Sequence, residues 1–250
     1  MKLKNKIVLV TGGSRGIGKG IVKSLAVSGY SVAFTYKENM AISEEIAKDF
    51  NLRGLDVAAF HLNQTNRECI QKCIIQIHEK FDYPISILIN NAAISQEKPF
   101  YRISNNDWEI MLKTNLQGPF MLLQEVLPDM VKSNFGRIVN ITSIGGQWGG
   151  FNQVHYAASK AALINLTQSI AKIYSQFGIT SNAVAVGLVQ TEMSNKELNS
   201  VEGKQKVANI PIGRIGQIVE IANTVNYLCS DKASYITGQT INLNGGMYFG

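Results

Sequence analysis

Short apolar runs alternate with longer segments of helical periodicity along nearly the whole chain. The runs are rich in β-branched residues, and the first of them, at positions 7–10, is apolar throughout. A strand that is apolar on both faces is typical of a parallel sheet covered by helices on both sides. The pattern predicts strands at 7–10, 31–36, 56–62, 85–89, 136–141, 181–186 and 240–243.

The segments between these runs predict crossover helices. Ile70, Ile74 and Ile77, for example, recur at steps of four and three residues, which places them on one helix face. Gly29 follows the first such segment and is typical of a helix C-terminus. Helices are predicted at 17–28, 40–51, 66–80, 104–132, 152–177 and 217–229, with a loop or lid at 187–216.

This regular alternation predicts an α/β fold with one doubly wound parallel sheet of the Rossmann type. The 250 residues contain no composition shift, repeat or low-complexity stretch that would mark a linker. We therefore expect a single domain over residues 1–250. Such sheets bind ligands at the carboxyl ends of their strands, so the residues that directly follow the strands are the candidates for function.

Composition and charge exclude several classes of protein. Three cysteines cannot form a disulfide framework, and no apolar run reaches the roughly 18 residues that a membrane helix needs. Only four apolar residues follow the basic start before Thr11, whereas a signal peptide needs about 7–15, so we expect a cytoplasmic protein. The net charge is +6, but the Lys and Arg residues are scattered singly, so nucleic-acid binding is not predicted. Cys69 and Cys73 lack a second pair of ligands, so no metal site is expected either.

A glycine-rich stretch lies between the first predicted strand and the first predicted helix. Its glycines allow a sharp turn and a close approach to a pyrophosphate, and the following helix offers free N–H groups. The spacing is G-x-x-x-G-x-G, which differs from the familiar G-x-G-x-x-G. Its place in the chain predicts a dinucleotide site, with a plain tight turn as the alternative. The candidate contacts are Gly12, Ser14, Arg15, Gly16, Ile17 and Gly18.

The residues after the second strand favour NADP(H) over NAD(H). Enzymes that use NAD usually place an acid there for the ribose hydroxyls, whereas NADP needs cations for its 2′-phosphate. Lys37 and Arg15 are cations that could reach this phosphate. Glu38 is an acid nearby, but it comes one residue late and is expected to point outward. Two surface cations without a ligand are the alternative interpretation.

Tyr156 and Lys160 are four residues apart in a predicted helix and therefore share a face. An ammonium beside a phenol lowers the phenol's pKa from about 10 toward neutrality and makes it a usable general acid or base. Ser143 follows the fifth strand, where its hydroxyl could hold a substrate carbonyl against Tyr156. Asn115 interrupts an apolar helical stretch, where Asn is mildly disfavoured, so it invites a functional explanation. A surface pair and a core amide are the alternatives.

Together these motifs resemble the short-chain dehydrogenase/reductase family over nearly the whole chain, from about Lys6 to Gly246. The glycine loop matches, residues 90–93 (Asn-Asn-Ala-Ala) resemble the family's motif after the fourth strand, and the four catalytic candidates match in identity, order and spacing. The C-terminal third is most similar to bacterial 3-oxoacyl-[acyl-carrier-protein] reductases, for example at 235–240 and 244–248.

The resemblance implies a role for each matched residue. Tyr156 would protonate a substrate carbonyl that receives hydride from the nicotinamide, and Ser143 would orient that carbonyl. Lys160 would bind the nicotinamide ribose and lower the pKa of Tyr156, while Asn115 would hold a water in a proton relay. The other implied cofactor contacts are Asn63, Asn90, Ala92, Val189 and Thr191. The candidate substrate contacts are Ser143, Gln147, Trp148 and Phe151, with core packing as the alternative for the last two.

The expected function is NADPH-dependent reduction of a 3-oxoacyl thioester, linked to acyl-carrier protein or CoA, in fatty acid biosynthesis. Another ketone or alcohol, such as a sugar or polyol, is the alternative substrate, and a dinucleotide sensor or scaffold is the alternative without catalysis. Family members usually form homotetramers through two long helices. The apolar excess in 116–131 and 157–173 is consistent with such an interface.

Three features depart from the family pattern. Ala93 replaces a glycine, which only tightens packing, and Val186 replaces a proline in the loop that shapes the nicotinamide pocket. An acidic carrier protein also calls for a basic docking patch. The ends of the two long helices offer only Lys132 and Lys172 for it, which weakens the carrier-protein assignment relative to CoA.

Overall fold

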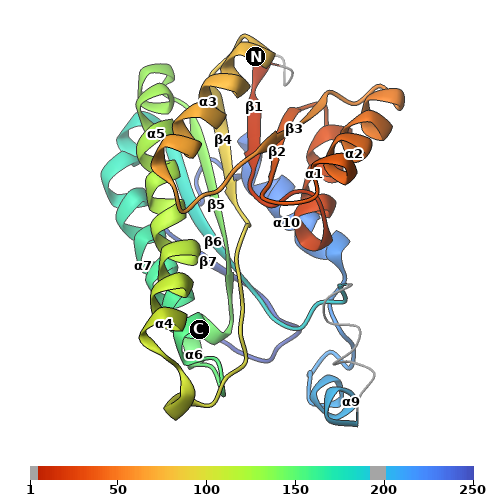
Figure 1. Cartoon of the computed structure of the whole chain (residues 1–250), viewed down its shortest axis with the longest axis vertical. Coiled ribbons are helices and arrows are strands. Elements are labelled where there is room, and N and C mark those ends of the chain that lie inside the picture. The colour runs from red at the N-terminus through yellow and green to blue at the C-terminus, as the bar shows by residue number, and fades with distance from the viewer. Residues whose placement is uncertain (1–4, 192–200) are drawn as a thin grey trace.

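Seven parallel strands lie side by side in the computed structural model, which describes residues 5–191 and 201–250. Their order is β3-β2-β1-β4-β5-β6-β7, as Figure 1 shows. The order reverses direction between β1 and β4, and ligands bind near such switch points. The predicted α/β fold of the Rossmann type is therefore confirmed. The strands are β1 (Ile7–Val10), β2 (Ser31–Tyr36), β3 (Val57–His61), β4 (Ile85–Asn90), β5 (Gly136–Ser143), β6 (Ile179–Val186) and β7 (Thr240–Leu243).

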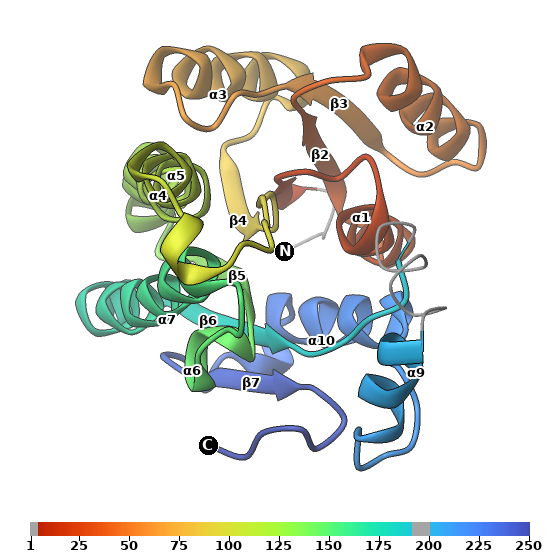
Figure 2. The same ribbon diagram turned by 60° about the horizontal axis from the view of Figure 1, so that its bottom comes forward.

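Helices cover both faces of the sheet (Figures 1 and 2). One face carries α1 (Gly16–Val27), α2 (Met40–Leu52) and α10 (Ile218–Cys229), and the other carries α3 (Arg67–Phe81), α5 (Gly118–Ser133) and α7 (Val154–Tyr174). Shorter elements are η2 (Phe100–Arg102), α4 (Asn105–Leu112), η3 (Lys113–Gln117), α6 (Gly145–Trp148), η4 (Ser175–Phe177), α9 (Val201–Ala208) and η5 (Asp231–Ala233). Over the part of the chain that the structure describes, none of the helices has the length and apolar content that crossing a membrane requires.

The two cores explain why the strands are apolar at every position. In β1, Val8 and Val10 belong to the core under α1 and α10, whereas Ile7 and Leu9 belong to the core under α3 and α5. All four side chains are completely buried. Successive residues of a strand point to opposite faces, so a sheet covered on both sides needs apolar residues at both sets of positions.

The first and the last long helix pack closely against each other on one face of the sheet. A Cβ on Gly20 of α1 would lie 2.2 Å from Cγ2 of Ile218, so only a glycine allows α10 to approach this far. Asn226 of α10 donates hydrogen bonds to the carbonyl and hydroxyl oxygens of Ser24 at 3.2 and 3.0 Å. The N-terminal and C-terminal thirds of the chain therefore share one core.

The structure corrects the sequence prediction in three places. The single helix predicted at 104–132 is divided into α4, η3 and α5, and η3 is a π-helical turn that contains Asn115. The predicted strand at 136–141 continues to Ser143, because its last two residues pair with Ala185 and Val186 of β6. The predicted loop at 187–216 contains α9, whose short sequence includes a glycine and lacks a clear apolar stripe. Residues 192–200 of that loop lie outside the described part.

We expect a Leu→Ala substitution to lower the free energy of unfolding much more in the core than on the surface. Leu88 is completely buried in the middle of β4, and Leu52 at the end of α2 is 78% exposed. We expect Leu88→Ala to lower the free energy of unfolding by about 2–5 kcal/mol, because it removes buried methyl groups and leaves a cavity. The matched change Leu52→Ala should alter it by less than about 0.5 kcal/mol. Urea denaturation measures both, and equal losses for the two variants would contradict this core.

Candidate active site

The glycine-rich loop between β1 and α1 has no room for side chains at two of its glycines. A Cβ on Gly18 would lie 2.2 Å from the carbonyl oxygen of Gly12, and one on Gly13 would lie 2.5 Å from Cβ of Phe34. Gly12 and Gly16 have φ angles of +65° and +52°, which glycine adopts without steric cost. The loop thus presents bare backbone at the start of α1, where helix N–H groups lack partners within the helix and the helix dipole favours an anion.

Asn91 and Thr11 lock this loop to the end of β4. Nδ2 of Asn91 donates to the carbonyl oxygens of Thr11 (2.9 Å) and Gly12 (3.1 Å). Oγ1 of Thr11 in turn accepts from the backbone N–H groups of Asn91 and Ala92, both at 3.0 Å. Asn90 and Ala92 of the motif at 90–93 were predicted to contact the cofactor, whereas no role was predicted for Asn91. The pair of adjacent amides directly after a strand is the signal that could have revealed it.

Asn90 is 3% exposed and is held from the side by neighbouring elements. Its Nδ2 donates to Oδ1 of Asn140 at 2.8 Å, and Nδ2 of Asn140 donates to Oγ1 of Thr167 at 2.8 Å. Oδ1 of Asn90 is buried and accepts no hydrogen bond from any described residue. A buried acceptor without a partner is costly in a folded protein, and this one at the carboxyl end of β4 suits a hydroxyl donor such as a ribose.

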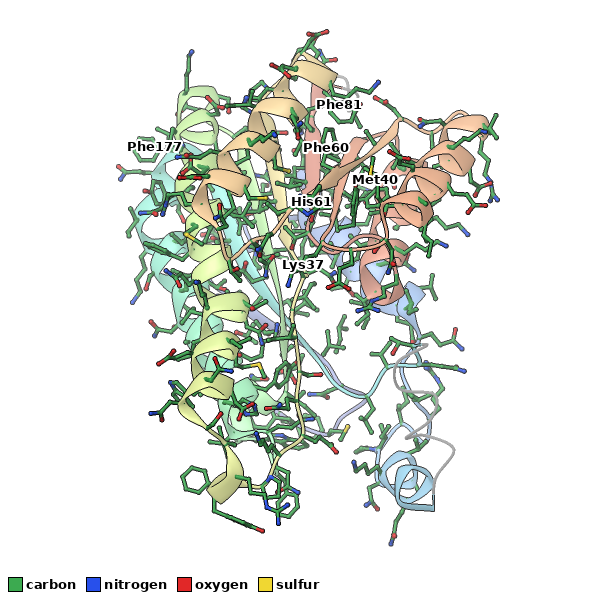
Figure 3. The ribbon with its side chains drawn as sticks, viewed as in Figure 1. Lys37, Met40, Phe60, His61, Phe81 and Phe177 are labelled. Carbon is green, nitrogen blue, oxygen red and sulfur yellow. The ribbon has the colours of Figure 1, made fainter. Side chains whose placement is uncertain are left out.

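Two exposed cations flank the glycine loop. Lys37 directly follows β2, as Figure 3 shows, and Arg15 directly precedes α1, where its side chain caps no helix N–H group. Since β1 and β2 are parallel neighbours, both side chains leave the sheet at the same edge. Glu38 is exposed beside them. Ser14 is half-buried, and Ile17 packs its side chain against the core, so only its backbone faces the loop.

The remaining cofactor predictions fall on two other loops at this edge. Oδ1 of Asn63 accepts from the backbone N–H and hydroxyl of Thr65 at 3.2 and 2.8 Å, and Asn63 lines a surface hollow at the start of α3. Val189 is buried and forms a β-bridge with Gly216. Cγ2 of Thr191 lies 3.9 Å from where a Cβ on Gly16 would be. The loop after β6 therefore reaches the glycine loop.

Ser143, Tyr156 and Lys160 converge where β5 ends and α7 begins. The Ser143 hydroxyl lies close enough to the Tyr156 phenol to act on its pKa. Nζ of Lys160 is buried, donates to the carbonyl oxygen of Ile141 at 2.8 Å and lies 5.7 Å from the centre of the Tyr156 ring. The structure thus brings three of the four catalytic candidates together in one cluster, in which Lys160 is buried and Ser143 and Tyr156 are half-buried.

The pKa of Tyr156 differs from the expectation. Burial raises it above the ordinary value of 10, and the nearby Ser143 hydroxyl acts against this rise without cancelling it. Burial also lowers the pKa of Lys160 to about 8. Both shifts have the same cause, since leaving water disfavours the charged form of each group. The expected lowering of the Tyr156 pKa by Lys160 is therefore wrong for the protein by itself, which keeps the phenol protonated.

Asn115, the fourth candidate, lies on the π-helical turn and is 1% exposed. Its Oδ1 accepts from the backbone N–H of Ile94 and its Nδ2 donates to the carbonyl oxygen of Ile94, both at 2.9 Å. Nδ2 also lies 3.1 Å from Oγ of Ser159, which donates to the carbonyl oxygen of Tyr156 at 2.7 Å. Asn115 thus fastens the segment after β4 to the helix that carries Tyr156.

Gln64 makes a second connection that the sequence analysis overlooked. Its Nε2 donates to the carbonyl oxygens of Ala92 (3.0 Å) and Thr114 (2.8 Å), and so joins the end of β4 to η3. Gln64 and Ser159 are both buried polar residues. No local motif marks either of them, because Gln64 binds backbone 28 and 50 residues away and Ser159 accepts from the side chain of Asn115, 44 residues away.

The chain is similar to proteins of known family. Residues 12–248 match the profile of a family described as enoyl-(acyl carrier protein) reductase. The chain is 42% identical to the 3-oxoacyl-[acyl-carrier-protein] reductase FabG of Aquifex aeolicus over 251 residues, and 40% identical to that of Vibrio cholerae over 249 residues. Each alignment covers 99% of both chains. The chain belongs to the short-chain dehydrogenase/reductase family. It is an oxidoreductase that acts on CH–OH groups, and its family implies a nicotinamide dinucleotide as cofactor.

Solved structures of this family share the fold closely. A crystal structure titled gox2181 superposes with a TM-score of 0.93 at 31% identity, covering 98% of this chain and 96% of the other. A putative gluconate dehydrogenase from Agrobacterium tumefaciens gives a TM-score of 0.94 at 29% identity, covering 98% and 97%. The fold thus accommodates relatives with differently named substrates, so the substrate must be argued from the site.

The residues of this short-chain dehydrogenase/reductase fit a dinucleotide. The glycine loop at the start of α1, with positive φ at Gly12 and Gly16, offers backbone that suits a pyrophosphate, and the unsatisfied Oδ1 of Asn90 can take a ribose hydroxyl. Bound there, the cofactor supplies or accepts a hydride. The clustered phenol and serine hydroxyl at the same edge can give a proton and a hydrogen bond to an oxygen that gains charge.

The predicted substrate contacts surround α6. Oε1 of Gln147 is buried and accepts no hydrogen bond from the described residues. Trp148 is half-exposed, with its ring edge-on to Tyr248 at 6.2 Å between centres, and Phe151 is 94% exposed. Neither aromatic ring is a core residue, so the core-packing alternative is wrong for both. All three remain candidates for contact with a substrate.

The pKa of Tyr156 gives a test without any ligand. In the cofactor-free protein we expect the Tyr156 phenol to ionise at a higher pH than tyrosine amide, which ionises near pH 10. Because the unfolded chain has the ordinary pKa, the stability that comes from burying the neutral phenol is full below about pH 10 and is lost as the pH rises through the folded value. The absorbance of the phenolate, measured for the wild type minus Tyr156→Phe, follows this ionisation. An ionisation of Tyr156 below pH 10 would contradict the assignment.

Proposed function

We propose that this protein reduces the 3-oxo group of an acyl thioester to a 3-hydroxy group, with NADPH as the hydride donor. The observation that carries the proposal is the cluster of Ser143, Tyr156 and Lys160 at the carboxyl end of β5, the same edge of the sheet as the glycine loop. The substrate class is taken from relatives at 38–42% identity that are named 3-oxoacyl-[acyl-carrier-protein] reductase and align over nearly the whole chain. We also propose that residues 1–250 act as one domain, since all the described strands join one sheet.

In this proposal Tyr156 is the acid, since burial keeps its phenol protonated in the cofactor-free protein. Its protonated phenol gives a proton to the carbonyl oxygen of the substrate as that oxygen gains negative charge, while the Ser143 hydroxyl donates a hydrogen bond to the same oxygen. Lys160, with a pKa of about 8, is still charged at neutral pH. Its ammonium stabilises the phenolate at the moment when the phenolate forms.

Asn115 completes the proposed proton path. Its Oδ1 accepts one hydrogen bond from Ile94, and a carbonyl oxygen has two lone pairs, so it can accept a second from a water. Such a water would return a proton toward Lys160 after each turnover. Cofactor contacts at Asn63, Asn90, Ala92, Val189 and Thr191, and substrate contacts at Gln147, Trp148 and Phe151, belong to the same proposal.

The choice of NADPH depends on the two exposed cations. Arg15 and Lys37 leave parallel neighbouring strands at the edge where the glycine loop lies, so both can reach a 2′-phosphate. A guanidinium binds phosphate through two N–H groups, and a lysine adds a point charge.

The second candidate is the same chemistry on a different ketone or alcohol. The similarity to a putative gluconate dehydrogenase and the open position of Phe151 favour it, because an exposed wall does not by itself select an acyl chain. We propose a homotetramer in either case. Exposed apolar side chains on α4, α5 and α7, namely Ile110, Phe120 and Ile173, support a contact between copies.

Removal of the acid should abolish turnover while leaving the fold. Tyr156→Phe is expected to lower kcat with acetoacetyl-CoA about 10²–10⁴-fold, the usual contribution of a general acid. The assay follows the absorbance of NADPH. Tyr235→Phe is the matched control, since this ring is fully exposed, and it should leave kcat unchanged. If the wild type binds NADPH but does not oxidise it with the thioester, the substrate proposal fails, and a panel of sugar and small ketones tests the second candidate.

Loss of a phosphate contact should change the cofactor preference. Lys37→Ala is expected to raise the Kd of NADPH about tenfold, the cost of one exposed charge-assisted hydrogen bond, and to leave the Kd of NADH unchanged. Lys48→Ala, an exposed lysine of α2, should change neither value. Quenching of protein fluorescence measures both affinities. Equal weakening of NADPH and NADH by Lys37→Ala would contradict a 2′-phosphate contact.

A further inference from the structure

The irregular segment after β4, residues 94–98, is fastened to the start of α7 by several separate contacts. The backbone N–H of Lys98 donates to the carbonyl oxygen of Asn152 at 2.7 Å. Nε2 of Gln153 lies 3.5 Å from Oε1 of Glu97, at the limit of a hydrogen bond. At the other end of the segment, Ile94 is bound to Asn115 through both its N–H and its carbonyl. The segment therefore lies between two elements that carry catalytic candidates.

His155 makes the contact in the middle of this segment. It directly precedes Tyr156 and is completely buried, which is unusual for an imidazole that belongs to no assigned site. Its Nε2 lies 3.0 Å from Oε1 of Gln96. Neither the catalytic cluster nor the dinucleotide cradle uses His155.

The neighbours of Gln96 fix the proton on His155. Nε2 of Gln96 donates to Oδ1 of Asp107 at 3.2 Å, so the amide oxygen of Gln96 is the atom that faces the imidazole. An amide oxygen only accepts, so Nε2 of His155 carries the hydrogen. Nδ1 is then a bare acceptor, and it is buried without a hydrogen-bond partner among residues 5–191 and 201–250. In this neutral tautomer only Nδ1 lacks a partner, and a second proton on Nδ1 would have no acceptor among the described residues either.

Asp107 anchors the far side of the same network. Its Oδ2 accepts from Nζ of Lys98 at 2.5 Å, and from the hydroxyl and N–H of Ser104 at 2.6 and 2.8 Å. The contact from the Ser104 N–H, together with a hydrogen bond from the Asp107 N–H to Oγ of Ser104 at 3.2 Å, forms the capping box that begins α4. Asp107 is thus held in place by its own helix, so the Gln96 side chain is fixed between a rigid carboxylate and His155.

We propose that His155 is a positioning residue for the reduction: as a neutral donor to Gln96, it holds residues 94–98 against the start of α7 and so keeps Asn115 and Tyr156 in register at the substrate side of the site. The inference rests on the proposed function for its kinetic consequences only. The contact itself exists without cofactor or substrate.

The proposal has a definite pH dependence. The charged groups facing His155 are Asp107 from α4, which favours protonation, and Lys98 from the segment, which opposes it. Burial is the largest cause, and it lowers the pKa of His155 below its ordinary 6.5. As the pH falls, His155 is therefore protonated at a higher pH in the unfolded chain than in the folded protein. The stability that neutral His155 contributes is full above about pH 6.5 and is lost as the pH falls through the folded value.

Two substitutions of His155 separate the hydrogen bond from the titration. His155→Phe keeps an aromatic ring but removes the hydrogen-bond donor. Amide hydrogens of residues 94–98 in the cofactor-free protein should then exchange about tenfold faster. The KM of acetoacetyl-CoA should rise about tenfold, with a smaller change in kcat. His155→Gln places an amide nitrogen near the position of Nε2 and does not titrate. It should restore exchange and KM to within about twofold of the wild type. It should also remove the rise in KM that we expect of the wild type as the pH falls through the folded pKa of His155, which lies below 6.5.

Further variants keep the test decisive. Gln96→Leu removes the hydrogen-bond acceptor at an exposed position, so this variant should fold and should reproduce the His155→Phe result. The double variant should show little further change, because both substitutions break the same contact. His78→Gln, on the half-exposed surface of α3, controls for loss of an imidazole and should change nothing. The Kd of NADPH should stay constant, because Ala92 is held by Thr11 and Gln64.

The outcomes of the exchange experiment are independent of the substrate. Wild-type exchange of 94–98 in both His155→Phe and Gln96→Leu would overturn the proposal, even if acetoacetyl-CoA proves to be a substrate. Faster exchange without any turnover of the thioester by the wild type would support the positioning role and refute only the proposed substrate. An unchanged pH profile of KM in His155→Gln would overturn the protonation part.

Discussion

The parallel contact between β1 and β4 is the interaction on which the site depends. These strands pair from Ile7 to Val10, and the chain leaves their carboxyl ends in opposite directions. The ladder does not stop with the strands, because the N–H of Thr11 donates to the carbonyl of Ile89 at 3.0 Å and Asn91 then takes over two carbonyls of the glycine loop. Bare backbone of this kind would otherwise need water as its partner. The same contacts that complete the sheet therefore also hold the cradle open for a ligand.

Burial controls the proton chemistry of the site more strongly than nearby charge does. Lys160 is buried and Tyr156 is half-buried, and desolvation shifts the pKa of each toward its neutral form. A phenol kept protonated is suited to give a proton, and an ammonium with a pKa near neutrality is suited to pass one on. Tyr156 lies beside Ser143, and Lys160 donates to the carbonyl oxygen of Ile141. Both groups are therefore oriented before a substrate binds.

Much of the fold follows from local sequence pattern, and much of the site does not. Strands such as β1 are visible because burial on both faces requires four consecutive apolar residues, and the glycine loop is visible because its spacing is local. Tyr156 and Lys160 are separated by one helical turn, so a periodicity argument can pair them. Asn91 and Gln64 bind backbone that is 28–80 positions away, and Ser159 binds the side chain of Asn115 44 positions away, so no window of sequence contains both partners. The π-helical turn at η3 and the upward shift of the Tyr156 pKa are likewise consequences of packing.

Because α1 packs closely on α10, the core that they share cannot form until α10 has been synthesised. The apolar side chains Ile21, Val22 and Leu25 of α1 emerge early in synthesis, but Ile221 and Val225, which share their core, come about 200 residues later. Until the last quarter of the chain leaves the ribosome, this side of the N-terminal half has no cover. A nascent chain of this protein therefore carries an exposed apolar surface for most of its translation, and such surfaces bind chaperones or associate with one another. The contact between α1 and α10 at Gly20 can therefore form only after most of the other residues of the chain have been synthesised.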